Sequence, residues 1–268
     1  TQFGITMAVA VGISAVNAFT LSPALCALLL KPYIDDLLSG TVRGYVLPKT
    51  DGSEGNREGL RTAVIERHLF GGTCVNVGCV PTKTLVASAR AVRQAQRGAE
   101  YGFDAGDIRV NMARVKARKE GIVLHSRQAV EAWMRGLAHT EVITGEARFV
   151  ATATLEVNGR QLTAPRIFLN VGGRSVRPEL QGIDEVPTLD NVSIMELEAV
   201  PEHLVIVGGS YIGLEFAQMM RRFGAQVTVV ERSARLLPRE DADVSDGIRE
   251  ILQAEGLRFE LEAECLSL

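Results

Sequence analysis

The chain has 268 residues, with 29 basic and 32 acidic side chains and a formal net charge of -3. This length allows one large domain or two ordinary ones, and the charge balance gives no reason to expect a nucleic-acid partner. Four cysteines are too few for a disulfide framework, which favours a reducing compartment.

The first segment, from Phe3 to Leu30, contains no charged residue and accounts for the mean hydropathy of +0.11. A bilayer is crossed by roughly 20 apolar residues, so the segment is long enough to span one. A signal peptide fits poorly because no basic region precedes it, and a buried core helix is the weaker alternative. The segment resembles one transmembrane helix of a resistance-nodulation-division efflux transporter, but the proton relay and drug-binding regions of such pumps have no counterpart.

Membrane insertion through residues 3–30 is therefore expected. Basic residues follow the span, which places the rest of the chain in the cytoplasm, anchored at the inner (plasma) membrane of a bacterium. These residues are Lys31, Arg43, Lys49, Arg57 and Arg61. Residues 33–60 carry five glycines and a proline without clear apolar periodicity, which predicts a linker.

The motif Gly71-Gly72-Thr73-Cys74-Val75-Asn76-Val77-Gly78-Cys79-Val80-Pro81-Thr82-Lys83 predicts a turn that leads into a helix. Both sulfurs would lie at the helix start, where unpaired N–H groups and the helix dipole lower a thiol pKa. A redox-active pair fits this arrangement, and a structural disulfide or half of a zinc site are the alternatives. A zinc site needs four ligands, and Cys26 and Cys265 are distant in sequence, so no metal site is predicted.

This motif resembles the active-site segment of the FAD-dependent pyridine nucleotide-disulfide oxidoreductases, which include glutathione reductase, lipoamide dehydrogenase and mercuric reductase. The resemblance implies a flavoprotein that passes electrons from NAD(P)H through FAD to a Cys74–Cys79 disulfide. Cys79 would contact the flavin as a thiolate, and Cys74 would attack the substrate. Gly72 and Thr73 would lie against the cofactor. The acceptors implied are small disulfides, Hg(II) and quinone-like molecules, with mercuric reductase closest in overall character.

Two more residues near the motif take roles by the same resemblance. Arg61 to Glu66 reads as a short buried strand, and Glu66 would bind the adenosine ribose of FAD, whereas a lone acid at a strand end is usually just solvated. Lys83 would approach the flavin as a catalytic and cofactor-binding residue, with an exposed helix lysine as the alternative. The Gly-x-Gly-x-x-Gly turn that should hold the FAD pyrophosphate is missing from residues 33–60.

A helix is expected from Cys79 to Arg97, and a long amphipathic one from Asn111 to Leu137. Alternating patterns then predict four strands, with Asn158-Gly159 as a hairpin turn. They cover residues 142–145, 147–150, 154–157 and 166–171. Gly145, Ala147 and Gly172 resemble backbone segments that pass close to FAD, although ordinary turn glycines would look the same.

A second nucleotide site follows the strand Leu204–Val207. The turn Gly208-Gly209-Ser210-Tyr211-Ile212-Gly213 leads into a helix from Leu214 to Phe223 and a strand from Gln226 that ends at Glu231. This order is typical of a dinucleotide fold, although Ser210 replaces the middle glycine.

Several side chains around this turn also receive roles. Glu231 favours the free 2′-hydroxyl of NADH, whereas Arg232 and Arg235 weaken that preference. By resemblance, Tyr211 would cover the flavin until nicotinamide enters. Glu215 would form a buried, catalytic ion pair with Lys83.

The fold class expected is α/β, a partial two-dinucleotide-binding-domain, Rossmann-like FAD/NAD(P) fold preceded by one hydrophobic transmembrane-type helix. The expected domains are a transmembrane helix (1–32), a linker (33–60), an incomplete FAD-binding domain (61–190) and an incomplete NAD(P)-binding domain (191–268). The segment that holds the FAD ribityl phosphate and the dimerisation domain of the family's homodimer have no counterpart. An inactive chimera, or an efflux-transporter fragment with an inert passenger, therefore stay open beside the enzyme.

Overall fold

The computed structural model describes residues 61–267, and their contacts divide them into two units. The first unit holds residues 61–67 and 135–171, and the second holds residues 68–134 and 172–267. The predicted transmembrane helix and the linker, where the FAD turn was expected, lie outside the described residues. No helix within 61–267 is both long and apolar enough to cross a membrane. The expected boundary between an FAD-binding and an NAD(P)-binding domain depends on which nucleotide each segment binds, so it stays a prediction.

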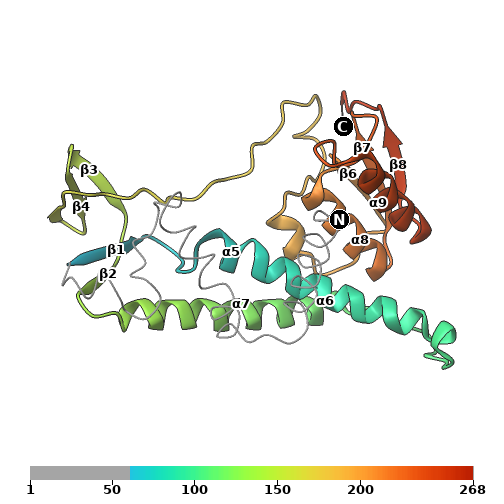
Figure 1. Cartoon of the computed structure of the whole chain (residues 1–268), viewed down its shortest axis with the longest axis horizontal. Helices are drawn as coiled ribbons and strands as arrows, with labels where there is room; N and C mark the ends of the chain where they lie inside the picture. The colour runs from blue at the N-terminus through green and yellow to red at the C-terminus, as the bar shows by residue number, and fades with distance from the viewer. Residues whose placement is uncertain (1–60, 268) are drawn as a thin grey trace, which may run out of the picture. The chain divides into compact units, whose positions relative to one another are not determined.

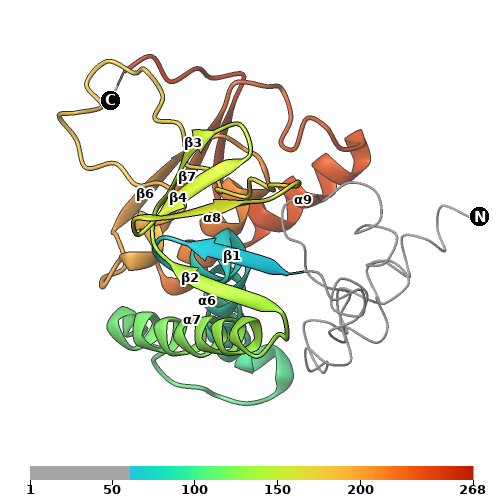
Figure 2. The ribbon, with the colours of Figure 1, turned by 90° about the vertical axis from the view of Figure 1, so that its left-hand side faces the viewer.

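In the first unit, two strands form a parallel pair, β1 (Thr62–Glu66) and β2 (Thr140–Thr144), which lie side by side in Figure 2. A separate antiparallel sheet contains β3 (Ala147–Ala151), β4 (Thr154–Val157) and β5 (Arg160–Thr163). Asn158 and Gly159 join β4 to β5 with positive φ angles of 53° and 75°, so the predicted hairpin turn is confirmed.

Two strand predictions in this unit need correction. β1 forms as predicted, but most of its residues are only half-buried, because β2 is its single partner in the described sheet. The strand predicted at Arg166–Val171 does not form. An isolated strand leaves its N–H and C=O groups unpaired, and this segment joins no ladder in the described sheets. Its apolar residue Val171 is 87% exposed.

The second unit begins with helices that carry the cysteine motif. The short α5 (Gly72–Asn76) precedes α6 (Cys79–Gln96), and a 3-10 turn, η1 (Gly98–Tyr101), separates α6 from the long α7 (Met112–Arg135). Hydrogen bonds join α7 to both earlier helices, and Figure 1 shows α7 running beside them. The long helices agree with the predicted ranges to within two residues. Gly102, with φ of 83°, ends η1 in a left-handed conformation that glycine adopts without strain.

After a second 3-10 turn, η2 (Ser193–Glu196), the chain forms three parallel strands in the order β6, β7, β8. β6 (His203–Val207) is followed by α8 (Tyr211–Phe223), β7 (Gln226–Glu231), α9 (Ala242–Ala254) and β8 (Arg258–Leu261). This strand, helix, strand repeat is the arrangement expected of half a dinucleotide-binding fold. The second predicted nucleotide unit is thus present as an α/β structure.

The core of the second unit lies around α8. Its buried face, which includes Phe216, Ala217 and Met220, packs with β7 residues such as Val229. Leu85 on α6 belongs to the same core. Burying apolar side chains stabilises a fold by about 25 cal/mol per Å², so this shared core fixes the cysteine-bearing helix α6 against α8.

Candidate functional site

Glycines shape the turn that carries the two cysteines. Gly71 and Gly72 enter α5 with φ angles of 98° and 61°, in the left-handed region that glycine adopts without strain. Gly78 lies so close to the preceding turn that a Cβ there would be 2.9 Å from the carbonyl oxygen of Thr73 and 3.2 Å from Cα of Cys74. The absence of a side chain at Gly78 therefore lets Cys74 approach the start of α6.

The two cysteines are free thiols on two helices rather than one. Cys74 lies within α5, whereas Cys79 is the first residue of α6, and both side chains are exposed. The prediction that the helix carries both residues is wrong in this detail. Both thiols still meet at one helix start, because the Cys74 sulfur contacts Cys79 and the backbone N–H groups of Cys79 and Val80.

The pKa of Cys74 is raised from 9.0 to about 11, which corrects the expectation of a lowered value at this cysteine. Although its side chain is exposed by surface area, loss of hydration around the thiol is the largest cause. The hydrogen bond with Cys79 and the charge of Cys79 add to it. The two N–H groups at the start of α6 lower the pKa, as a helix start should, but they are outweighed.

Lys83 and Glu215 link α6 to α8. Lys83 lies one turn after Cys79 on α6, and its Nζ donates to Oε1 of Glu215 on α8. The predicted contact is therefore present, but the pair is not buried: the Lys83 side chain is 63% exposed and that of Glu215 is 35% exposed. Neither Lys83 nor Glu215 belongs to the shared core, so solvent reaches the pair. Its catalytic role stays a prediction.

The turn between β6 and α8 has the features of a dinucleotide cradle. Gly208 has φ of 109°, and a Cβ there would meet nothing within 4 Å, so its backbone faces open space. A Cβ at Gly213 would lie 2.5 Å from the carbonyl oxygen of Gly208, so this glycine lets the helix pack against the turn. Ser210 precedes α8 in an extended conformation and is exposed, so a serine fits here without strain.

Glu231, at the end of β7, is buried beneath this turn. The backbone N–H of Gly209 donates to Oε2 at 2.7 Å, and that of Ser233 donates to Oε1 at 2.8 Å. Burial raises the pKa of this carboxyl, but the two N–H groups outweigh burial and the net pKa is lowered. Glu231 therefore holds the glycine turn. Arg232 beside it is exposed, and Tyr211 is 67% exposed at the start of α8.

The remaining predicted cofactor residues are divided between the two units. In the first unit, Glu66 ends β1, and its carbonyl oxygen accepts the N–H of Gly145 at 3.0 Å. A Cβ on Gly145 would be 2.5 Å from Oδ1 of Asn158, so the chain itself fills the space beside this glycine. Ala147 begins β3 opposite Val157 and is exposed.

In the second unit, Gly172 (φ 74°) lies near the cysteine turn. A Cβ on Gly172 would be 3.8 Å from Oγ1 of Thr73, so these two predicted FAD contacts are neighbours. Among residues 61–267 there is no group of three or more His, Cys, Asp or Glu side chains arranged to hold a metal ion.

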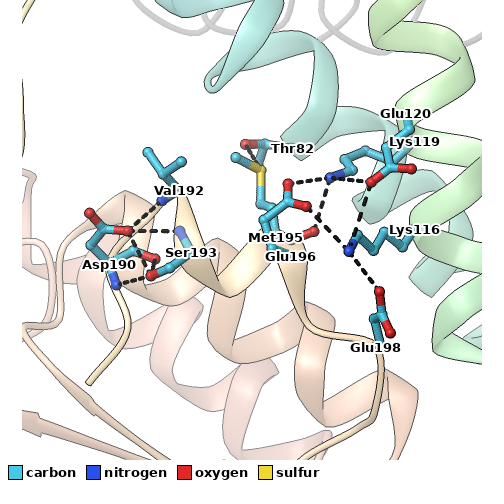
Figure 3. A network of polar contacts seen from close by, with 10 residues as sticks. All are labelled: Thr82, Lys116, Lys119, Glu120, Asp190, Val192, Ser193, Met195, Glu196 and Glu198. Carbon is cyan, nitrogen blue, oxygen red and sulfur yellow. Dashed lines mark hydrogen bonds and ion pairs between the residues drawn. The ribbon is translucent and has the colours of Figure 1, made fainter. Parts of the chain in front are cut away.

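Sequence reasoning missed a polar network between α7 and η2. Lys119 is 4% exposed, and its Nζ donates to the carbonyl oxygen of Met195 at 3.1 Å and to Oε1 of Glu196 at 2.6 Å (Figure 3). Lys116, one turn earlier, donates to Glu198 at 2.9 Å. A lysine on an amphipathic helix looks like a surface residue in sequence, and no local signal marks its distant partner.

A second missed contact involves the cysteine turn itself. Asn76, the last residue of α5, accepts a hydrogen bond from Nε of Arg127 on α7 at 2.7 Å. The asparagine falls inside the motif, and asparagine side chains commonly bond to nearby backbone. Arg127 had no such signal because it is 51 residues away.

Comparison with known proteins agrees with this geometry. Residues 53–267 match the family model described as pyridine nucleotide-disulphide oxidoreductase. A mercuric reductase of Bacillus cereus is 37% identical over 199 residues, covering 74% of this chain and 32% of the relative. A dihydrolipoyl dehydrogenase of Bacillus subtilis is 31% identical over 244 residues, covering 86% of this chain and 50% of the relative.

Among solved structures, the HOCl-induced flavoprotein disulfide reductase RclA from Escherichia coli matches with a TM-score of 0.67 and 35% identity. The match covers 78% of this chain and 45% of that one. The chain thus spans a third to a half of the relatives it matches. With the family model matched over most of its length and the strand, turn and helix order in place, this chain belongs to the pyridine nucleotide-disulfide oxidoreductase family.

Proposed function

We propose that the chain carries the redox dithiol and the nicotinamide-nucleotide site of an oxidoreductase that moves electrons from NAD(P)H through FAD to a Cys74–Cys79 disulfide. From there the electrons pass to a disulfide, Hg(II) or a similar acceptor. The observation that carries this proposal is the contact between the two thiols at the start of α6, one turn before a lysine paired with the nucleotide helix.

The residues present fit a nicotinamide dinucleotide. The open backbone at Gly208 and the free N–H groups at the start of α8 provide space and positive potential for a pyrophosphate. The Glu231 carboxylate, fixed under the turn, supports NADH slightly over NADPH, because a 2′-phosphate would be repelled. The exposed Arg232 acts in the opposite direction.

The described residues also fit a flavin beside the dithiol. Cys79 and Lys83 lie one turn apart on α6, and both are exposed, which leaves their side chains accessible to a flat ring. When bound, FAD would supply two-electron transfer between the nicotinamide and the disulfide. Glu215 would hold the Lys83 ammonium in position on this side of the helix.

The chemistry of the dithiol follows from its proton. A pKa of about 11 leaves roughly 10⁻⁴ of Cys74 as thiolate at pH 7, and the thiolate is the nucleophile. Cys74 must therefore lose its proton to a base as it attacks. With a disulfide substrate, Cys74 forms a mixed disulfide and releases one substrate thiol. Cys79 then displaces the second thiol, which forms the Cys74–Cys79 disulfide and leaves the substrate reduced by two electrons.

The test uses the full chain with its cysteines oxidised, incubated with FAD and either NADH or NADPH. The expected result is flavin absorbance that bleaches on addition of the reduced nucleotide, together with the appearance of two thiols per chain. Cys74→Ser serves as the control, because it retains the nucleotide site but forms no Cys74–Cys79 disulfide. A colourless protein that stays colourless with added FAD and releases no thiols would refute the proposal for this chain.

A further inference from the structure

The turn that holds Cys74 has little to stabilise it by itself. α5 contains five residues, none of them buried, and its start has no side-chain cap. It is entered through two consecutive glycines in the left-handed region. A helical turn of this length is unstable alone, because forming the first turn costs more entropy than its hydrogen bonds return.

Asn76 closes this turn with its side chain. Its Nδ2 group donates to the carbonyl oxygens of Phe70 and Gly72, both at 2.9 Å. These bonds reach from the last residue of α5 to its first residue and to the residue before the two glycines. The side-chain amide therefore fixes the backbone on both sides of Cys74.

Arg127 fixes the orientation of Asn76. Its Nε donates to Oδ1 of Asn76 at 2.7 Å, from the middle of the 24-residue α7. A bond to Oδ1 leaves the Nδ2 group directed at the two carbonyl oxygens. Because guanidinium is always charged, this bond belongs to the stronger class, in which one partner is ionised.

Packing does not hold Asn76 in place by itself. Asn76 and Arg127 both line a cavity of about 360 Å³, together with Val77, Pro81, Val123 and Met195. Space beside the amide would let it rotate if the bond from Arg127 were removed. The hydrogen bond from Arg127 thus fixes the Asn76 side chain, as close packing fixes side chains elsewhere in a core.

The same long helix also holds α6. Nη1 of Arg118 donates to the carbonyl oxygen of Thr84 at 3.0 Å and to Oγ of Ser88 at 3.3 Å. α7 therefore bonds to both cysteine-bearing helices: its Arg118 bonds to α6, and its Arg127 bonds to α5. Of the two arginines, Arg118 bonds to the body of α6 beyond Cys79, whereas Arg127 bonds to the turn that carries Cys74.

We infer that Arg127 and Asn76 are positioning residues for the dithiol, which hold the Cys74 sulfur against Cys79 and so favour closure of the disulfide. Neither residue touches the substrate. They act by raising the effective concentration of the Cys74 thiol at Cys79. This inference rests on the proposed function.

The test measures the dithiol without flavin or nucleotide. The full chain is equilibrated with mixtures of reduced and oxidised glutathione, trapped with acid, and scored for the Cys74–Cys79 disulfide by mass spectrometry. Each closure oxidises two protein thiols and reduces one oxidised glutathione to two reduced molecules. For Arg127→Ala and Asn76→Ala we expect the equilibrium constant for closure to fall roughly tenfold, since a hydrogen bond to a charged group is lost.

The rate of Cys74 alkylation provides a second readout, which should rise where the closure constant falls. At pH 8, Cys74 should react faster with iodoacetamide in Arg127→Ala, because a thiol separated from Cys79 ionises more readily. Arg118→Ala is the matched control. It removes an arginine of the same helix that bonds to α6 rather than to the Cys74 turn, and both readouts should stay close to wild type.

A double-mutant cycle decides whether the two residues act together. In the Asn76→Ala/Arg127→Ala variant the closure constant should fall no further than in either single variant. An unchanged closure constant in Arg127→Ala, or a shift equal to that of Arg118→Ala, would overturn the inference. If Arg127→Ala does not fold, Arg127→Met is measured instead. Methionine keeps a long unbranched side chain but has no N–H donor, and a wild-type constant in that variant overturns the inference.

The glutathione experiment also separates this inference from the proposed function. A wild-type chain that forms no Cys74–Cys79 disulfide at any glutathione ratio contradicts the proposed function. A wild-type chain that forms it, with variants that behave identically, contradicts only the positioning role.

Discussion

Lys83 on α6 and Glu215 on α8 form an ion pair that connects the cysteine helix to the helix that follows the glycine turn after β6. The pair lies at the surface of the second unit, with the Lys83 side chain 63% exposed. Exposed ion pairs contribute little to stability because water screens both charges and the side chains lose freedom. The role proposed for this pair is therefore in the reaction rather than in folding.

Glu215→Ala should accordingly leave the free energy of unfolding within about 1 kcal/mol of wild type. It should slow flavin reduction by NAD(P)H in the flavin-loaded chain, because Lys83 would lose its partner. Urea unfolding and stopped-flow absorbance measure the two effects. Unchanged flavin reduction would contradict the catalytic role of this residue.

The Cys74 thiol should show a pH dependence set by its neighbour. Its rate of alkylation should increase up to about pH 11, where its pKa lies. Cys79→Ser removes the charge and thiol contact that help to raise this pKa, so the profile should move to lower pH. Burial remains in the variant, so the shift should be partial. An identical profile in Cys79→Ser would show that the two thiols do not interact.

The same pKa has a consequence for stability. Unfolding restores the Cys74 pKa to 9.0, so between pH 9 and 11 the unfolded chain has released a proton that the folded chain retains. The free energy of unfolding should therefore fall as the pH rises through this interval. Urea unfolding of wild type and Cys74→Ser at both ends of the interval measures this contribution, since the groups outside the pair of thiols titrate equally in the two proteins.

Gly213→Ala should damage the proposed nucleotide site through the backbone. The new Cβ would lie 2.5 Å from the carbonyl oxygen of Gly208, which cannot move without opening the turn. We expect a loss of about 1–3 kcal/mol in stability and weaker NADH binding. Gly247→Ala in α9 is the control, because a Cβ there meets nothing within 4 Å. It should increase stability by roughly 0.5–1 kcal/mol. Equal effects of the two substitutions on NADH binding would refute the explanation.

Lys119→Met should destabilise the second unit by about 1–3 kcal/mol, because it leaves the Met195 carbonyl oxygen without its buried donor. Lys116→Met, which removes a more exposed ammonium from the same helix, should cost less. Differential scanning calorimetry of the two variants provides the comparison. A larger effect at Lys116 would contradict the assignment of Lys119 as the buried anchor.

The Lys119 network also predicts an acid dependence. The hydrogen bond from Lys119 is the main reason that the pKa of Glu196 is lowered below 4.5. Because the folded pKa is the lower one, this contribution is present above pH 4.5 and is lost as the pH falls through the folded value. The acid-induced fall in stability should be smaller in Lys119→Met than in wild type, and an identical fall would argue against the coupling.

The sequence by itself determined the local elements of this protein. The motif around Cys79 marked the start of a helix, Asn158-Gly159 marked a hairpin, and the glycines after β6 marked the turn into α8, because each depends on residues adjacent in the chain. It also indicated the contact between Lys83 and Glu215, through the likeness of both segments to one family.

The tertiary structure decided what depends on residues distant in sequence. Arg127 reaches Asn76 from 51 residues away, and Lys119 reaches η2 across 76 residues or more. Neither pairing has a periodic signal. The failure of Arg166–Val171 to form a strand has the same origin, since a strand exists only where a partner completes its ladder. The raised pKa of Cys74 likewise depends on the neighbours that surround its sulfur rather than on its position near a helix start.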